Sequence, residues 1–176
     1  KPKDVFYIPS GRVHAILPGI VLAEIQQSAD VTYRIYDWDR VDDQGKGREL
    51  HLEEATEVID FKEYPEYRVK YHTNKNTTSP IVDEKYFTTN VIQFDHALEK
   101  NYEEMDSFII LLVTEGRVRM ENEGQIMDLK KGEVVLLPAI TNKVQFYPET
   151  DTNLLEVYIK QEYKQGFSAL EMELGV

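Results

Sequence analysis

The stretch from which the fold can be read is DVFYIPSGRVH, residues 4–14. Residues 5–8 are apolar or aromatic, which is typical of a β-strand, and Pro9 and Gly11 then predict a tight turn. The chain returns from this turn to His14, whose neutral ring nitrogen is a good ligand for zinc or iron. We therefore expect two strands with His14 on the second. The alternative is that His14 is an ordinary hydrogen-bonded strand residue.

Period-two alternation and β-branched or aromatic residues recur along most of the chain. Residues 31–36 alternate in this way, and residues 108–113 form a continuous apolar run that is typical of a strand buried on both faces. Further runs of this kind occur at residues 13–16, 20–25, 87–94, 117–120, 126–129, 134–137, 143–147 and 154–159. Strands of this length and spacing predict an all-β sandwich or small barrel.

One of these runs belongs to an internal repeat. The segment KDVFYIP, residues 3–9, is similar to KGEVVLLP, residues 131–138, because each has a charged turn and a β-prone run closed by proline. The repeat predicts two related β units, the first of them cut short at its N-terminal side.

The segments between and after the β units are more polar. Leu52, Ala55, Val58 and Ile59 have helical spacing and predict a helix from about residue 52 to residue 60. Residues 61–80 read as a linker with at most one short strand, and residues 99–106 as a solvated acidic turn. The tail, residues 161–176, fits either a short helix or a disordered end.

The charge of the chain excludes some partners. The 20 basic and 32 acidic side chains give a net charge of −12, which disfavours binding to nucleic acid or to an anionic membrane. Residues 1–40 carry five basic and five acidic side chains and are therefore neutral. There is no cysteine, so disulfides and thiol chemistry are excluded. The longest apolar run, residues 108–113, is too short to span a membrane.

Four blocks of sequence together resemble the bacterial zinc-dependent mannose-6-phosphate isomerases of the cupin superfamily. They are DVFYIPSGRVHAI (residues 4–16), LAEIQQS (22–28), TYRIYD (32–37) and RELH (48–51). The first block contains the P-x-G-x-x-H form of the second metal motif of cupin barrels. The resemblance implies one partial and one complete cupin jelly-roll unit. On this basis we expect half of the active-site barrel over residues 1–45, a helix and linker over 46–80, a second barrel over 81–160 and a tail over 161–176.

The resemblance also implies a function. The family interconverts mannose 6-phosphate and fructose 6-phosphate, and we expect the same reaction in the cytoplasm with zinc bound in part by His14. Glu24 matches a carboxylate beside the metal, and Arg34 matches the active-site arginine. A carboxylate can move the proton between C1 and C2, and a guanidinium can stabilise oxyanion charge or bind phosphate. The base stays open between Glu24, a metal-bound water and a residue outside this chain.

Each of these residues also has an ordinary structural interpretation. Glu24 can be a surface carboxylate on a strand, and Arg34 can be a surface ion-pair partner of Asp37 or Asp39. If their segments are strands, Glu24 shares a face with Gln26, and Arg34 shares a face with its second neighbours in either direction.

Some features depart from the family. The other zinc ligands, a Gln-x-His pair and a later Glu, have no match, so we expect the chain to be the C-terminal portion of a longer enzyme and to be inactive alone. In the second unit Pro138, Ile140 and Lys143 stand where P-x-G-x-x-H would be, so no metal is expected there. The open edge of the partial barrel predicts a dimer or an N-terminal partner.

Two other functions compete with the isomerase. The chain can be a non-catalytic, degenerate cupin that binds a sugar or only packs against other domains. A cupin oxygenase with iron is a weaker alternative, because the blocks around Glu24 and Arg34 fit the isomerase pattern.

Overall fold

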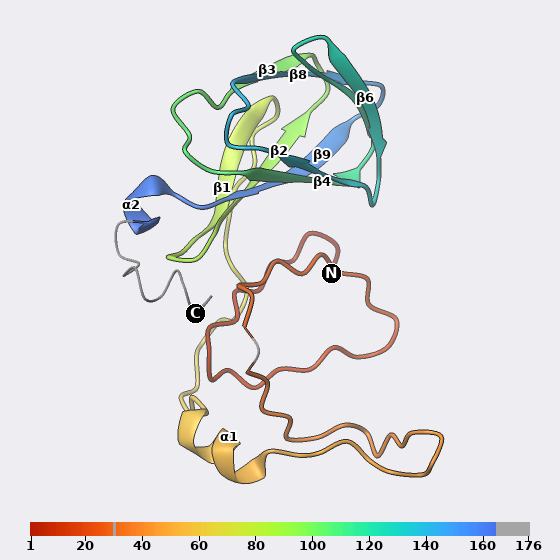
Figure 1. Ribbon diagram of the computed structural model, residues 1–176, viewed down its shortest axis with the longest axis vertical. Coiled ribbons are helices and arrows are strands. Elements are labelled where there is room, and N and C mark those ends of the chain that lie inside the picture. The colour runs from red at the N-terminus through yellow and green to blue at the C-terminus, as the bar shows by residue number, and fades with distance from the viewer. Residues whose placement is uncertain (30, 165–176) are drawn as a thin grey trace. The chain divides into compact units, whose positions relative to one another are not determined.

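The computed structural model describes residues 1–29 and 31–164, and the chain divides there into two compact units. The sandwich unit contains Lys1–Val5 and the described residues from Val69 onward, and the loop unit is Phe6–Arg68. Figure 1 shows all labelled strands in the sandwich unit and the helix α1 (Leu52–Val58) in the loop unit. The two units therefore differ sharply in regular structure.

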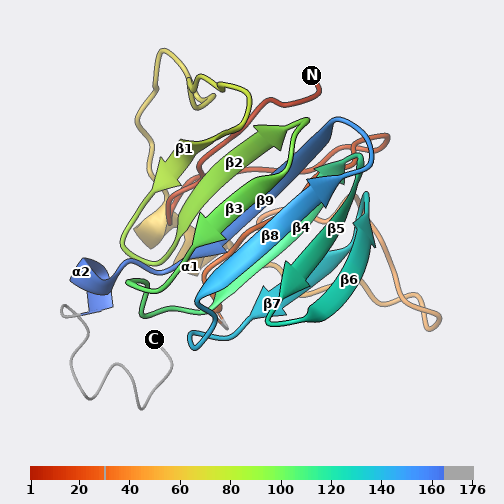
Figure 2. The same cartoon turned by 90° about the horizontal axis from the view of Figure 1, so that it is seen from above.

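The sandwich unit consists of two antiparallel sheets. One sheet has the order β1-β2-β9-β4-β7 and the other the order β3-β8-β5-β6. The strands are β1 (Thr77–Asp83), β2 (Thr88–Phe94), β3 (Leu98–Asn101), β4 (Ile109–Glu115), β5 (Arg117–Asn122), β6 (Gln125–Lys130), β7 (Val134–Leu137), β8 (Lys143–Pro148) and β9 (Thr152–Tyr158). Figure 2 shows the sheets facing each other. The last strand, β9, pairs with both β2 and β4 and so lies between two strands from early in the sandwich unit, as in a jelly roll.

The core lies between the two sheets. It contains the buried residues Ile92, Phe94, Tyr102, Ile109, Leu111, Val113, Val118, Met120, Leu129, Leu137, Val144, Phe146 and Leu154. Alternate residues of β4 enter it, because side chains of a strand point to opposite faces. The rings of Phe94 and Phe146 meet across it with centroids 6.0 Å apart. Burial of these apolar side chains is the main force that holds the sheets together.

The strands predicted after residue 81 are confirmed. The expectation that residues 108–113 are buried on both faces is wrong, because Phe108 is exposed and Ile110 and Leu112 are only half-buried. The predicted acidic turn is also wrong in part, since it overlaps β3 and contains the buried Tyr102. Tyr102 belongs to the core, although the acidic residues around it in the sequence predicted an exposed turn. The strand β1 begins inside the predicted linker, which allowed one short strand.

The helices agree with expectation where the structure describes them. The helix α1 ends at Val58, within two residues of the prediction, and it buries Ala55. The short helix α2 (Gln161–Lys164) begins the predicted tail, and residues 165–176 of that tail lie outside the described residues. Neither helix in the described residues has the length and apolar content needed to cross a bilayer.

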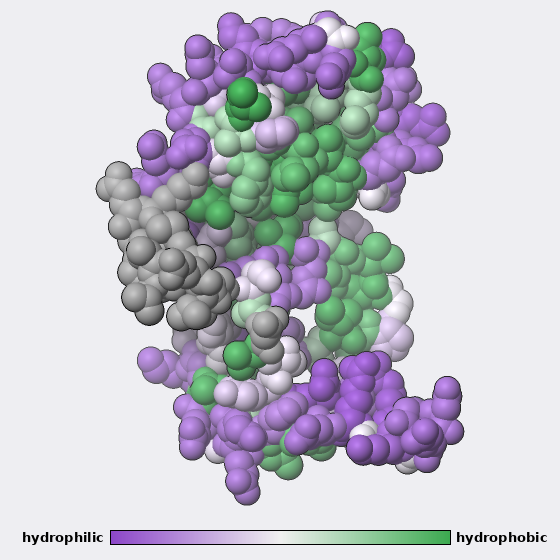
Figure 3. Space-filling model, viewed as in Figure 1, coloured by the Kyte–Doolittle hydropathy of each residue, from purple (hydrophilic) through white to green (hydrophobic). Residues whose placement is uncertain are grey.

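The strands predicted at residues 5–8, 13–16, 20–25 and 31–36 are wrong. In the described part of the loop unit only isolated bridges form, Phe6 with Arg68 and Val41 with Gly47. Strand-like composition cannot satisfy the backbone groups of a segment that has no neighbouring strand. The apolar side chains of these segments consequently face outward, as Val21 does with full exposure. Figure 3 shows hydrophobic residues on the surface of both units.

Candidate functional site

The turn that carries the metal motif forms as predicted. The backbone N–H of Arg12 donates to the carbonyl of Pro9 at 3.3 Å, and Gly11 has a φ of +82°. A Cβ at position 11 would lie 2.3 Å from the carbonyl oxygen of Val58. The N–H of Asp60 donates to the carbonyl of Gly11 at 2.9 Å. Glycine is therefore required both by the backbone angle and by the close approach of the segment after α1.

His14 follows this turn as an exposed side chain. Its Nδ1 lies 2.9 Å from the carbonyl oxygen of Arg12. A carbonyl oxygen can only accept, so Nδ1 carries the hydrogen in this contact, and in the neutral ring Nε2 then keeps the lone pair. His14 is thus held by a local hydrogen bond in the tautomer that presents Nε2 as a potential metal ligand.

The other two predicted site residues are placed differently. Glu24 is exposed, whereas Arg34 is half-buried and its backbone is paired with His51. The N–H of Arg34 donates to Nδ1 of His51 at 3.1 Å, and the N–H of His51 donates to the carbonyl of Arg34 at 2.8 Å. His51 therefore fixes the backbone of Arg34. Among the described residues, no hydrogen bond or ion pair joins His14, Glu24 and Arg34 to one another. Because neither segment is a strand, the predicted sharing of faces does not hold.

Asp37 is a buried carboxylate that sequence reasoning considered only as a surface partner. It is 6% exposed, and three arginines surround it. Arg40 donates to its Oδ1 through Nη2, and Nε of Arg34 lies 3.8 Å from the same oxygen. Nε of Arg48 lies 3.8 Å from Oδ2. The Arg40 hydrogen bond lowers the pKa of Asp37 below its ordinary value of 3.8, and the other two arginines act in the same direction.

The sequence contained part of the signal for this cluster. Arg34 and Arg40 lie three residues before and after Asp37, a spacing that can be read from the sequence. Arg48 is brought in by the hairpin that the bridge between Val41 and Gly47 closes. The third arginine could therefore be assigned only from the structure.

The sandwich unit contains a buried polar cluster of its own. Glu156 is 1% exposed and accepts hydrogen bonds from Asn90 and Tyr102, each at 2.8 Å. Nζ of Lys100 lies 2.9 Å from Glu156 and donates to Thr78 at 2.7 Å. Burial and the nearby Glu156 carboxylate raise the pKa of Tyr102, which keeps its hydroxyl protonated. The cluster links β1, β2, β3 and β9, which is a structural role.

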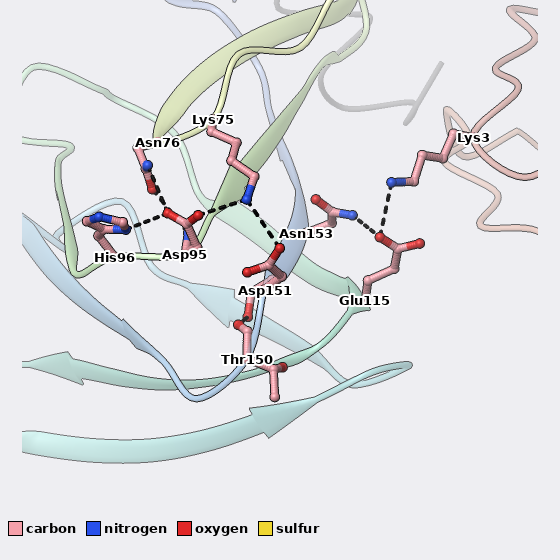
Figure 4. A network of polar contacts seen from close by, with 10 residues as sticks. Lys3, Lys75, Asn76, Asp95, His96, Glu115, Thr150, Asp151 and Asn153 are labelled. Atoms are coloured by element: carbon pink, nitrogen blue, oxygen red, sulfur yellow. Dashed lines mark hydrogen bonds and ion pairs between the residues drawn. The ribbon is translucent and has the colours of Figure 1, made fainter.

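A second polar network lies on the surface of the sandwich unit (Figure 4). Lys75 contacts Asp95 at 2.7 Å and Asp151 at 3.2 Å, while Asn76 donates to Asp95 at 3.0 Å. The hydrogen bond from Lys75 holds the pKa of Asp95 well below its ordinary value. In the same view Lys3 pairs with Glu115 at 3.2 Å. These contacts fasten the segments before β1 to the ends of β2, β4 and β9.

The described side chains do not form the metal site that the sequence predicts. No three His, Asp or Glu side chains in residues 1–29 and 31–164 gather where they could hold a metal ion. A tightly bound zinc ion needs three or four protein ligands. The described residues therefore do not form a zinc site by themselves, and His14 can supply one ligand at most to a site completed elsewhere.

Comparison with known proteins gives one consistent family. Residues 75–152 match the family described as mannose-6-phosphate isomerase, cupin domain. The chain is 39% identical over 140 residues to the mannose-6-phosphate isomerase ManA of Bacillus subtilis, a match that covers 78% of this chain and 44% of that protein. It is 33% identical over 147 residues to the mannose-6-phosphate isomerase of Streptococcus mutans, with 83% of this chain and 46% of that protein covered.

The fold comparison agrees. The crystal structure of the mannose 6-phosphate isomerase from Bacillus subtilis matches with a TM-score of 0.62 and 28% identity, over 74% of this chain and 41% of that one. The sandwich unit is therefore a cupin jelly roll, as expected from the sequence. The chain spans less than half the length of the curated relatives that it matches.

Proposed function

The chain belongs, through its cupin domain, to the mannose-6-phosphate isomerase family, and on that premise we propose that the intact gene product interconverts mannose 6-phosphate and fructose 6-phosphate. The observation that carries this proposal is the 39% identity to ManA, which extends over 78% of the chain. The match is longer than the sandwich unit, so it includes part of the loop unit. The proposed location is the cytoplasm, because a doubly charged sugar phosphate does not cross a bilayer unaided.

The predicted residues have chemistry that suits this reaction. The isomerisation moves a proton between C1 and C2 and places negative charge on oxygen in the transition state. We assign Glu24, which is exposed and open to a ligand, as a candidate for the group that carries the proton. We assign Arg34, whose backbone His51 holds in place, to negative charge on the substrate, either the developing oxyanion or the phosphate.

Zinc is part of the proposal only through His14. When bound, zinc would act as a Lewis acid toward the sugar oxygens. His14 presents Nε2 as one possible ligand, and the described residues do not complete a site around it. We therefore propose that the isolated chain of 176 residues is inactive.

The test is an isomerase assay on the intact gene product with mannose 6-phosphate. We expect turnover that a chelator abolishes and that His14→Ala reduces by at least about tenfold, since loss of a ligand weakens metal binding. The matched control is His72→Ala, because His72 is an exposed histidine outside the set of predicted site residues. Stoichiometric zinc without any isomerase activity would refute the proposal.

One observation favours a non-catalytic alternative for the chain by itself. His14 and Glu24 are exposed, and no hydrogen bond or ion pair joins them in the described residues, so the chain can be a degenerate cupin that binds a sugar or only packs. Titration of the isolated chain with zinc separates the two proposals. Tight binding would contradict our assignment of a single ligand, and absence of binding with an active intact protein would favour the isomerase.

A further inference from the structure

Arg34 lies in a segment without regular structure, and its main chain is held by one residue. Residues 31–36 form neither strand nor helix. Among the described residues, the only main-chain groups of this segment that make hydrogen bonds are the N–H and the carbonyl of Arg34, and both of them bond to His51. The guanidinium of Arg34 is paired with Asp37, whose Oδ1 lies 3.8 Å from Nε. The position of Arg34 therefore depends on His51 at the backbone and on Asp37 at the side chain.

His51 is also the N-cap residue of α1, and its side chain does not serve the helix. The carbonyl of His51 accepts from the N–H of Ala55 at 3.0 Å, and Ala55 is buried, so the helix fixes the main chain of His51. The imidazole makes no capping hydrogen bond. Serine, threonine, asparagine and aspartate are the usual residues at this position, because their oxygens accept from the free N–H groups of the first turn. His51 leaves that stabilisation unused, and its ring bonds to Arg34 instead.

The contact with Arg34 uses one particular nitrogen of the imidazole. Nδ1 of His51 accepts from an N–H, so it carries the lone pair, and in the neutral ring Nε2 carries the hydrogen. This is the opposite tautomer to that of His14. The ring of Tyr33 lies beside the imidazole with the two centroids 6.1 Å apart, which restricts the ring orientation. The hydrogen bond from Arg34 therefore requires a neutral imidazole in one tautomer and in one orientation.

We propose that His51 is a positioning residue for the reaction, because its Nδ1 sets the backbone of Arg34 and hence the direction of that guanidinium. This inference rests on the proposed function, which gives Arg34 its role. His51 touches no substrate in this assignment and acts only through Arg34. A shift of about 1 Å in a group that must meet the substrate can slow a reaction about a hundredfold. The single hydrogen bond therefore matters more for activity than for stability.

The test is an isomerase assay on the intact gene product with His51→Ser. A serine at this position supplies the missing helix cap, but its side chain is too short to replace Nδ1 as the acceptor for Arg34. We expect kcat/KM for mannose 6-phosphate to fall by about tenfold to a hundredfold. The melting temperature should stay within about 3 °C of the parent, because the new cap offsets the lost hydrogen bond. His72→Ser, at an exposed histidine outside the predicted site, is the matched control and should change neither quantity.

Two further measurements separate positioning from a general structural role. In the Arg34→Ala background, His51→Ser should have no further effect on kcat/KM, because both changes act through one guanidinium. In isotope-labelled intact protein, the nitrogen nuclei of the Arg34 amide and of Nδ1 of His51 should show a scalar coupling across their hydrogen bond, which His51→Ser abolishes. This coupling reports the contact whether or not the protein is an isomerase.

The outcomes distinguish this inference from the proposed function. If kcat/KM of His51→Ser stays within about twofold of the parent, or if its loss multiplies with that of Arg34→Ala, the positioning role is refuted while the isomerase stands. If the parent has no isomerase activity, the proposed function is refuted, and absence of the coupling refutes the hold of His51 on Arg34 as well. If His51→Ser does not fold, His51→Gln replaces it, since its oxygen stands in for Nε2 and not for Nδ1, and retained activity there also refutes the role.

Discussion

Residues 5–8 and Val134–Leu137 are similar β-prone runs that each end at a proline, yet only the second forms a strand. As β7, it pairs with β4 through four successive residue pairs. In the first run Phe6 forms only an isolated bridge with Arg68. Strand formation was therefore decided by the presence of a neighbour and not by the composition of the run.

The same difference separates the two units as a whole. The core of the sandwich unit contains thirteen buried residues, whereas the described part of the loop unit buries a single apolar residue, Ala55. The loop unit is held instead by local turns and ion pairs such as those of Asp37. We therefore expect the two units to respond differently to the same kind of substitution.

The largest difference is expected for loss of apolar volume. Phe94→Ala removes a fully buried ring that contacts Phe146 and should lower the free energy of unfolding of the sandwich unit by about 3–5 kcal/mol. Val21→Ala removes a fully exposed side chain from the loop unit and should change the free energy of unfolding of that unit by less than about 0.5 kcal/mol. Urea unfolding followed by near-ultraviolet circular dichroism measures both. Equal losses would show that the loop unit has a core that depends on Val21.

A smaller difference is expected for two glycines with the same steric conflict. A Cβ at Gly116 or at Gly11 would lie 2.3 Å from a carbonyl oxygen, and both residues have positive φ. Gly116→Ala should cost the sandwich unit up to about 3 kcal/mol, whereas Gly11→Ala should disturb only the turn before His14.

The controls for this pair are Gly124→Ala and Gly19→Ala, which have positive φ but no atom within 4 Å of the new Cβ. They should cost only about 1–2 kcal/mol, from the backbone angle alone. Thermal unfolding and the amide chemical shifts of residues 10–14 report the two effects. A global loss of stability with Gly11→Ala would contradict an effect confined to the turn before His14.

The smallest effect is expected from acid. The pKa values of Asp95 in the sandwich unit and of Asp37 in the loop unit are both lowered, by Lys75 and Arg40 respectively. A lowered pKa stabilises the folded state above the unfolded pKa, and this contribution is lost as the pH falls through the folded pKa. The melting temperature of the sandwich unit should therefore fall below about pH 4, and Asp95→Asn should flatten that fall.

Asp37→Asn is the matched variant in the loop unit. It should leave the acid dependence of the sandwich unit unchanged, because the partners of Asp37 among the described residues, Arg34, Arg40 and Arg48, belong to the loop unit. A change in that dependence with Asp37→Asn would mean that the two units unfold together.

The candidate site was predictable only in part. The turn at Pro9 and Gly11 could be read from the sequence because two residue types with special backbone angles determine it locally. The pairing of His51 with Arg34 and the approach of Arg48 to Asp37 could not, since both depend on contacts across more than ten residues. Glu156 was missed for a related reason, because a carboxylate in an apolar strand is buried only when partners such as Asn90 satisfy it.

The sequence by itself determined the all-β class, the boundaries of most strands in the sandwich unit, the helix α1 and the resemblance to the isomerase family. Each of these depends on local periodicity or on short motifs. Only the tertiary structure decided which β-prone segments found a neighbour, which acidic residues were buried and which arginines share one carboxylate. Backbone and charged groups must be satisfied by specific partners, and those partners are set by the path of the whole chain and not by the pattern of any one segment.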